Sequence, residues 1–301
     1  MKKLTKFLSL LTITTSIFTS CVSELPLDEI SIKQYPTDGI QEISADLSYE
    51  SIEIKKSNDD QIRLEIKSNT GKKLPKVYVE NSKLCLKTTA RNSSFGHACT
   101  VTVYIPASFY SKNYNIETSS GYVLLDTLES DNFLIETSSG AIKLLSLSTP
   151  QTINVKASSG AIKVQNANCN YLKLKTSSGA IKSENTKCNY FDAKASSGAI
   201  KFDVAKQIDS NSSIKTSSGS VKLTVPKDMN FQIRASTSSG RFYDKINDSS
   251  CKPNNMLTKY NNGGTEIKIE TNTETTVETE KETVTEVETT ELTTKQILEV
   301  L

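Results

Sequence analysis

The chain has few of the side chains on which many catalytic and metal sites depend: one histidine, His97, and no tryptophan in 301 residues. This excludes a histidine-rich metal centre and argues against a Ser-His-Asp hydrolase. The formal net charge of +2 argues against a strong nucleic-acid binder. Glycine (12) and proline (7) are also scarce, whereas 40 serines and 34 threonines are present. With 36% hydrophobic residues the chain can still form a core, in one or two domains.

The N-terminal segment has the pattern of an export signal. Lysines precede a short apolar stretch over 7–18 that is too short for a membrane-spanning helix. Small residues then precede Cys21, and this arrangement resembles a bacterial lipoprotein signal. The resemblance implies a signal peptide over 1–20, a lipid on Cys21 that anchors the protein to a membrane of the bacterial cell envelope, and a tether over 21–36. An ordinary secretory signal with an incidental cysteine is the alternative.

A tripeptide repeat dominates the middle of the chain. Around each copy apolar and polar residues alternate, which predicts strands with one buried face. We therefore predict an all-β fold, a single β-solenoid over 112–270 with two strands per coil. The glycine would supply either a positive φ or a close approach between coils at a corner. Ser-Ser-Gly recurs at intervals of 19 to 21 residues and ends at Gly121, Gly140, Gly160, Gly179, Gly198, Gly219 and Gly240.

The segments on either side of the repeats differ from each other. Residues 37–111 also alternate and predict β-rich N-terminal coils or a cap, continuous with the solenoid and protecting one end from edge pairing. The irregular stretch 244–264 would protect the other end. Residues 271–301 contain 11 Thr and 8 Glu but no Ser, Gly or Pro, which predicts a disordered tail.

Lysines recur at two fixed positions relative to the corner glycine, both on the outward side by alternation. Stacked coils would align them in rows about 5 Å apart, which concentrates positive potential and suits anionic glycans, lipid headgroups or cell-wall polymers. The alternative is that exposed lysines only keep a strand-rich surface soluble. The rows are Lys143, Lys163, Lys182, Lys201 and Lys222 after the glycine, and Lys156, Lys175, Lys194 and Lys215 before it.

The cysteines predict structural pairs. Cys169 and Cys188 occupy equivalent places in two Cys-Asn-Tyr segments, so stacking brings them within disulfide range. Cys85 and Cys99 flank a turn, which predicts a second, cross-strand disulfide. In the same Cys-Asn-Tyr segments Tyr171 and Tyr190 would stack, either as a plain tyrosine ladder or as an aromatic platform for a sugar.

An enzymatic function finds little support in the sequence. Glycosidases need two placed carboxylates. We predict that acidic residues such as Asp126, Asp192 and Asp203 do not share one position of the repeat, so that stacked coils would not align them in a column. A catalytic serine need occur only once, which argues against a nucleophile in the repeated Ser-Ser-Gly. We predict no catalytic residue, no metal and no cofactor.

Residues 37–270 resemble the bacterial putative adhesin family, a domain of unknown function built from Ser-Gly turn repeats. The resemblance rests on the strand end Val103-Tyr104-Ile105-Pro106 and on the Ser-Ser-Gly-Ala-Ile-Lys series. It implies an envelope-facing β-solenoid and supplies no reaction. The function expected is a lipid-anchored, non-enzymatic, adhesin-like scaffold that binds anionic polysaccharides or other envelope polymers. The alternatives are a structural or signalling module that binds another envelope protein, and a polysaccharide-active β-helix enzyme.

Overall fold

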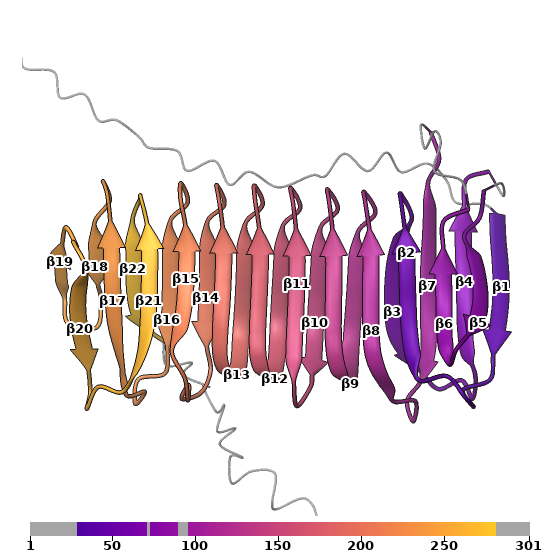
Figure 1. Ribbon diagram of the computed structural model, residues 1–301, viewed down its shortest axis with the longest axis horizontal. Coiled ribbons are helices and arrows are strands. Elements are labelled where there is room, and N and C mark those ends of the chain that lie inside the picture. The colour runs from indigo at the N-terminus through magenta and orange to yellow at the C-terminus, as the bar shows by residue number, and fades with distance from the viewer. Residues whose placement is uncertain (1–28, 71–72, 90–95, 281–301) are drawn as a thin grey trace, which may run out of the picture.

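The computed structural model describes residues 29–70, 73–89 and 96–280, and shows an elongated stack of coils with two strands each (Figure 1). The described residues form strands and turns without a helix, and the stack confirms the predicted all-β solenoid. One face of the stack, face 1, contains the strands that lead into the Ser-Ser-Gly corners. The opposite face, face 2, contains the strands that leave them. Three long strands run from face 2 of one coil into face 1 of the next, namely β9 (Val123–Thr137), β12 (Ile162–Thr176) and β13 (Ile181–Ala195).

The strands of face 1 run parallel to one another along most of the stack, and one antiparallel strand closes the face at each end. Its order along the stack is β5 (Lys76–Glu80), β6 (Lys83–Lys87), β2 (Glu42–Leu47), β8 (Ser111–Thr118), the second half of β9 (Val123–Thr137), β11 (Thr152–Ala157), the second halves of β12 (Ile162–Thr176) and β13 (Ile181–Ala195), β15 (Ser212–Thr216), β21 (Thr265–Thr271), β17 (Phe231–Thr237) and β20 (Met256–Tyr260).

Face 2 is built in the same way, with two antiparallel strands at one end and one at the other. Its order is β1 (Glu29–Tyr35), β4 (Ile62–Ser68), β7 (Cys99–Pro106), β3 (Ser51–Ser57), the first half of β9, β10 (Ile142–Ser148), the first halves of β12 and β13, β14 (Ile200–Val204), β16 (Val221–Val225), β22 (Thr275–Thr279), β18 (Phe242–Asp244) and β19 (Ser249–Cys251).

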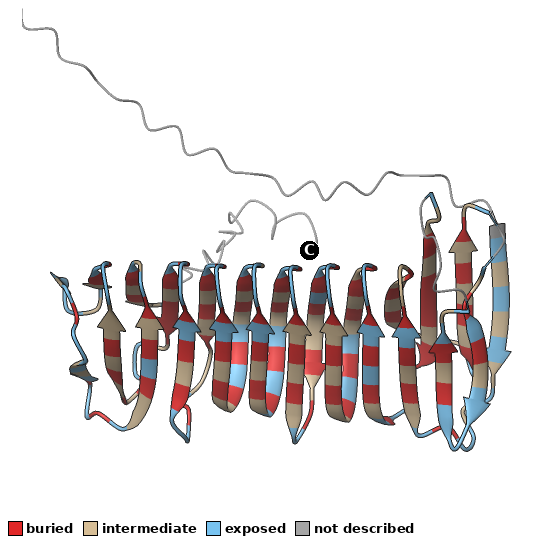
Figure 2. Cartoon of the chain, turned by 45° about the horizontal axis from the view of Figure 1, so that its top comes forward, coloured by how far each residue is buried: buried red, intermediate tan, exposed pale blue. Residues whose placement is uncertain are grey.

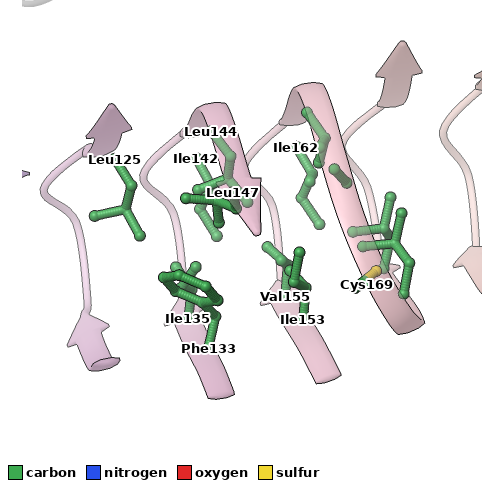
Figure 3. Close-up of a cluster of buried hydrophobic side chains, with 14 of the residues drawn as sticks. Leu125, Phe133, Ile135, Ile142, Leu144, Leu147, Ile153, Val155, Ile162 and Cys169 are labelled. Carbon is green, nitrogen blue, oxygen red and sulfur yellow. The ribbon is translucent and has the colours of Figure 1, made fainter. Parts of the chain in front are cut away.

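The core lies between the two faces and runs the length of the stack. Buried and exposed residues alternate along each strand, as Figure 2 shows by its bands of colour. Phe133 and Ile135 of face 1 point toward Ile142 and Leu144 of face 2 (Figure 3), and all four are at most 1% exposed. Each such side chain contributes about 1.5–3 kcal/mol by leaving water. The apolar columns of the repeat are therefore the layer that joins the faces.

The corners require glycine because neighbouring coils touch there. None of the seven corner glycines has a positive φ. A Cβ at Gly160 would lie 1.8 Å from the carbonyl oxygen of Gly140, and a Cβ at the other six would lie 1.7 to 2.0 Å from backbone oxygen. Of the two expectations for this glycine, close approach is the correct one.

In several corners a buried threonine completes the hydrogen bonding, whereas Ala157 and Ala195 take the same position in two others. The buried Oγ1 of Thr176 accepts from the Gly179 amide at 3.2 Å and donates to the Gly160 carbonyl at 3.1 Å. Thr216 makes the equivalent contacts to Gly219 and Gly198 at 3.2 and 2.9 Å. Each threonine thus closes its own turn and ties it to the previous coil.

The coils at the two ends are stacked out of sequence order. The coil of β2 and β3 lies between β6–β7 and β8–β9, and the coil of β21 and β22 lies between β15–β16 and β17–β18. Gly240 accordingly packs against Thr273 of the inserted coil. Both inserted coils therefore have hydrogen-bonded neighbours on each side, and the stack ends in antiparallel strands, which short turns can connect.

Two predicted boundaries are wrong. Residues 29–35, assigned to the tether, form β1 on β4. Residues 275–279, assigned to the disordered tail, form β22 between β16 and β18. Thr- and Glu-rich sequence can form a strand here because Thr275 and Val277 alternate inward and their neighbours outward. At the C-terminal end β19 and β20 of the segment 244–264 cap the stack as expected, whereas at the other end β5 of 37–111 caps face 1 and β1 of the predicted tether caps face 2.

Candidate functional site

The first lysine row runs straight along face 2. In each pair of neighbouring coils the lysines occupy the same register position, from Lys143 through Lys163, Lys182 and Lys201 to Lys222. Five consecutive coils thus present an ammonium group at a spacing of about 4.8 Å. The row is as predicted, and it ends where Leu124 and Thr276 take the position.

Carboxylates accompany part of this row. Glu184 contacts Lys182 at 2.5 Å and Lys163 at 4.0 Å, and Glu278 contacts Lys222 at 2.6 Å. The pKa of Glu184 is lowered, chiefly by its hydrogen bond to Lys182. These pairs offset the repulsion between stacked like charges. Lys143 and Lys201 have no carboxylate within ion-pair distance among the residues the structure describes.

Acidic residues also recur at one outward position beside the lysine row, which the sequence analysis missed. Asp126, Glu184 and Asp203 each lie five residues after a corner glycine, and the register between β13 and β14 shifts at this position, between Ser183 and Thr186. The expectation that acidic residues share no position of the repeat is therefore wrong for Asp126 and Asp203. Leu145 and Gln165 separate Asp126 from the other two. The glycine spacing would have shown the shared position had every outward position been aligned.

The second lysine row runs along face 1. Lys156, Lys175, Lys194 and Lys215 are in register over four coils. Three have partners: Lys156 with Glu136 at 2.5 Å, Lys194 with Asp192 at 2.7 Å and Lys215 with Glu270 at 2.7 Å. Glu136 and Glu270 occupy the same register position at the two ends of the row. The basic stretch is thus bounded by carboxylates.

The serine corners lie between the two rows. Both serines of the corners at 158–159, 177–178 and 196–197 are exposed, whereas the threonines and alanines that precede them are buried. A shallow groove of about 260 Å³ follows this edge on face 1, and its lining includes Glu136, Lys156, Ser158, Lys175 and Ser177. This edge offers hydroxyl groups flanked by ammonium groups, a combination that suits sulfate, phosphate or carboxylate groups on a polymer.

An aromatic pair lies on face 1, four residues before the lysine row. The rings of Tyr171 and Tyr190 stack with centroids 4.3 Å apart and planes at 14°. Next to them is a hollow of about 350 Å³, whose lining includes Asp192, Ser213, Glu266 and Lys268. The last two belong to the inserted strand β21. Their place beside Tyr190 follows only from the order of the coils, so sequence reasoning could not find it.

The cysteine predictions have different outcomes. Cys169 and Cys188 are in register on β12 and β13 and point into the core, 5% and 0% exposed. Both thiols are free in the structure, so their disulfide stays a prediction. Burial raises the pKa of Cys169 to about 12 and that of Cys188 further. These thiols do not resemble activated nucleophiles.

The prediction of a disulfide between Cys85 and Cys99 is wrong. Both thiols are free. Cys85 lies on β6, opposite Ser44 and Tyr78, and Cys99 lies on β7, opposite Ser68. The two strands belong to different faces and do not pair with each other.

Several other expectations concern chemistry that the described residues do not test. Cys21 and the signal segment lie outside the described residues. Within the described ranges no group of His, Cys, Asp or Glu is arranged to hold a metal ion. The same ranges contain no helix long and apolar enough to cross a membrane. His97 lies at the N-terminal end of the stack, with its Nδ1 3.3 Å from the Thr70 hydroxyl.

Comparison with known proteins gives a family and a set of similar structures. Residues 40–283 match the family model described as Toastrack DUF4097. No curated protein matches the chain. A crystal structure from Bacteroides fragilis NCTC 9343, described as a putative adhesin, is 16% identical with a TM-score of 0.48, and the match covers 85% of this chain and 99% of that one. A putative adhesin from Parabacteroides merdae ATCC 43184 is 11% identical (TM-score 0.44, 84% and 97% covered). A putative lipid binding protein from Parabacteroides distasonis ATCC 8503 is 12% identical (TM-score 0.43, 84% and 98% covered).

Proposed function

The chain belongs to the Toastrack DUF4097 family, and from the lysine rows on its two faces we propose that it is a non-enzymatic binding scaffold of the bacterial cell envelope that holds anionic glycans or related polymers. In this proposal a lipid on Cys21 anchors the scaffold to the membrane. The observation that carries the proposal is the register of Lys143, Lys163, Lys182, Lys201 and Lys222 over five consecutive coils.

A row of equal charges at a fixed spacing suits a repeating ligand. Each coil contributes one ammonium group about 4.8 Å from the next, so a polymer with regularly placed anionic groups contacts several lysines at once. Single contacts of this kind are weak and screened by salt, but linked contacts add through a high effective concentration. The rows thus favour an extended polymer over a small ion.

The ion pairs within the rows bear on this proposal in two ways. Glu184 already neutralises part of the charge of Lys163 and Lys182, which lowers the attraction for a distant anion. The side chains of Lys163 and Lys182 nevertheless remain 40% and 41% exposed. An incoming anionic group therefore exchanges one exposed ion pair for another, and the binding should be strongly salt-dependent.

The test is retention on immobilised dextran sulfate, with uncharged dextran as the control matrix, over a rising salt gradient. The row variant is Lys163→Gln/Lys182→Gln/Lys201→Gln. The matched control is Lys76→Gln/Lys83→Gln/Lys87→Gln, which removes the same charge from exposed lysines at the N-terminal end.

We expect the parent chain to be retained on dextran sulfate, the row variant to elute at clearly lower salt, and the control to elute close to the parent. Equal shifts in the two triple variants would mean that net charge alone causes retention. Passage of the parent chain through the column at low salt would refute the binding of anionic polymers.

A further inference from the structure

We propose that the hollow beside Tyr190 is a carbohydrate subsite that takes one uncharged sugar ring of a glycan. It lies on face 1 between the aromatic pair and the inserted strand β21, with β15 at its base. The inference deepens the proposed function and rests on it for the ligand class. It depends on different residues and on a different interaction.

The aromatic surface of the subsite is the free face of Tyr190, because Tyr171 covers the other face of that ring. Tyr171 and Tyr190 are both partly exposed and stack at 4.3 Å. The next coil places Ser213 opposite Asp192, so the position that follows Tyr190 in the same column is the short, exposed Asn211. Without a third ring the surface drops beyond Tyr190, and this step forms the hollow. A pyranose ring has an apolar face of C–H groups that can pack against this free face of Tyr190.

The polar rim is held in place before any ligand arrives. Asp192 accepts a hydrogen bond from the Ser213 hydroxyl at 2.6 Å and one from the Lys194 ammonium at 2.7 Å. On the opposite rim Glu266 accepts a bidentate pair from Arg234 at 2.9 to 3.1 Å. A carboxylate oxygen can accept more than one hydrogen bond, so both groups can still accept from sugar hydroxyls. Because their positions are already fixed, little ordering entropy is lost on binding.

The charge of the rim selects the kind of ring. Two carboxylates border the hollow and are paired with Lys194 and Arg234, and the lysine in its lining, Lys268, is paired with Glu270. An anionic sugar would therefore face Asp192 and Glu266, whereas an uncharged one offers them hydroxyl donors. Lys194 of the face 1 row lies four residues further along β13 than Tyr190, about 13 Å away. A glycan that crosses face 1 would thus place an uncharged ring on the tyrosine and an anionic group on the lysines.

The test uses uncharged hexasaccharides of glucose, mannose and N-acetylglucosamine with the purified full-length chain. Salt of about 0.5 M screens the lysine rows. Saturation-transfer NMR detects sugar protons that contact the protein, and titration calorimetry gives the Kd. The variants are Tyr190→Ala, Tyr190→Phe, which keeps the ring, and Tyr110→Ala. Tyr110 is 49% exposed and lies outside the hollow.

We expect at least one hexasaccharide to bind, with saturation concentrated on the C–H groups of one ring. Tyr190→Ala should weaken binding about tenfold, while Tyr190→Phe and Tyr110→Ala should change it less than about twofold. Circular dichroism of each variant shows that the fold is kept. No binding by any of the three sugars, or an equal loss in Tyr190→Ala and Tyr110→Ala, would overturn the subsite.

The two proposals fail separately. Binding of an uncharged sugar at Tyr190 together with no retention on dextran sulfate would refute the lysine rows and keep the subsite. Retention that depends on the rows, without binding of uncharged sugars, would refute the subsite and keep the rows.

Discussion

Replacement of Gly160 by alanine tests the contact that sets the spacing of the coils. The added Cβ would lie 1.8 Å from the Gly140 carbonyl oxygen, whereas ordinary contacts begin at 3.4 Å. The two corners would have to separate by about 1.6 Å, which a close-packed structure resists. Because backbone surrounds the site on the Gly140 side, no side chain can swing away to make room.

The loss of stability in Gly160→Ala follows from the hydrogen bonds at the corner. The Ser159 amide donates to the Ser138 carbonyl at 2.7 Å, and the Ser158 amide donates to the Thr137 carbonyl at 3.0 Å. A separation of about 1.6 Å carries both beyond hydrogen-bonding distance. Two lost bonds at about 1 kcal/mol each, added to the strain of overpacking, give a loss of about 3 kcal/mol in the free energy of unfolding.

The assay is urea unfolding followed by far-UV circular dichroism, with hydrogen-exchange mass spectrometry of the native state to locate the effect. Exchange is needed because a stack of coils can open locally. The control is Gly39→Ala, since Gly39 has a φ of +80° but open space around its Cβ position. That substitution should cost only about 1 kcal/mol, the price of a left-handed backbone.

We expect faster exchange in the peptides of the coils on both sides of Gly160, and a smaller, local effect for Gly39→Ala. If Gly160→Ala lowers the free energy of unfolding no more than Gly39→Ala does, close approach is not the reason why glycine recurs at the corners.

Three further predictions concern the corner, the C-terminal boundary and the buried thiols. Thr176→Val should lower the free energy of unfolding by about 1–3 kcal/mol in urea titrations, because it leaves a buried amide and carbonyl without their hydroxyl partner; an unchanged midpoint would contradict this role. Removal of residues 281–301 should leave the thermal midpoint unchanged, whereas removal of 272–301 takes away β22 and should lower it by several degrees; equal midpoints would show that β22 contributes nothing. In the reduced native protein at pH 8, Cys169 and Cys188 should react with iodoacetamide far more slowly than after unfolding, because burial raises the pKa of Cys169 to about 12 and that of Cys188 further. Mass spectrometry measures the two rates, and equal rates before and after unfolding would show that the thiols are not buried.

The features that recur at one repeat length could be predicted from the sequence. The period of the Ser-Ser-Gly motif gives the length of a coil, and alternation gives the inward and outward sides of each strand. Lys163 and Lys182 therefore lie in one row, as do Cys169 and Cys188. These inferences succeed because parallel stacking in register places equivalent positions side by side.

Alternation alone left other features open. The sequence left two reasons for the corner glycines, a positive φ or a close approach between coils. Only the position of the Gly140 carbonyl next to Gly160 decides between them. The cross-strand disulfide failed because spacing in sequence does not show whether two strands pair, and Cys85 and Cys99 lie on different faces.

The sequence by itself thus determined the coil, its two faces and its rows, because these depend on a period of two along each strand and on one repeat length. The tertiary structure decided which coil lies next to which. Backbone hydrogen bonds between parallel strands are the same for any pair of coils, so neither period nor composition specifies that β21 and β22 insert between β15–β16 and β17–β18. That insertion turns part of the acidic C-terminal segment into a strand of the core. It also brings Glu266 beside Tyr190, and so creates the proposed sugar subsite.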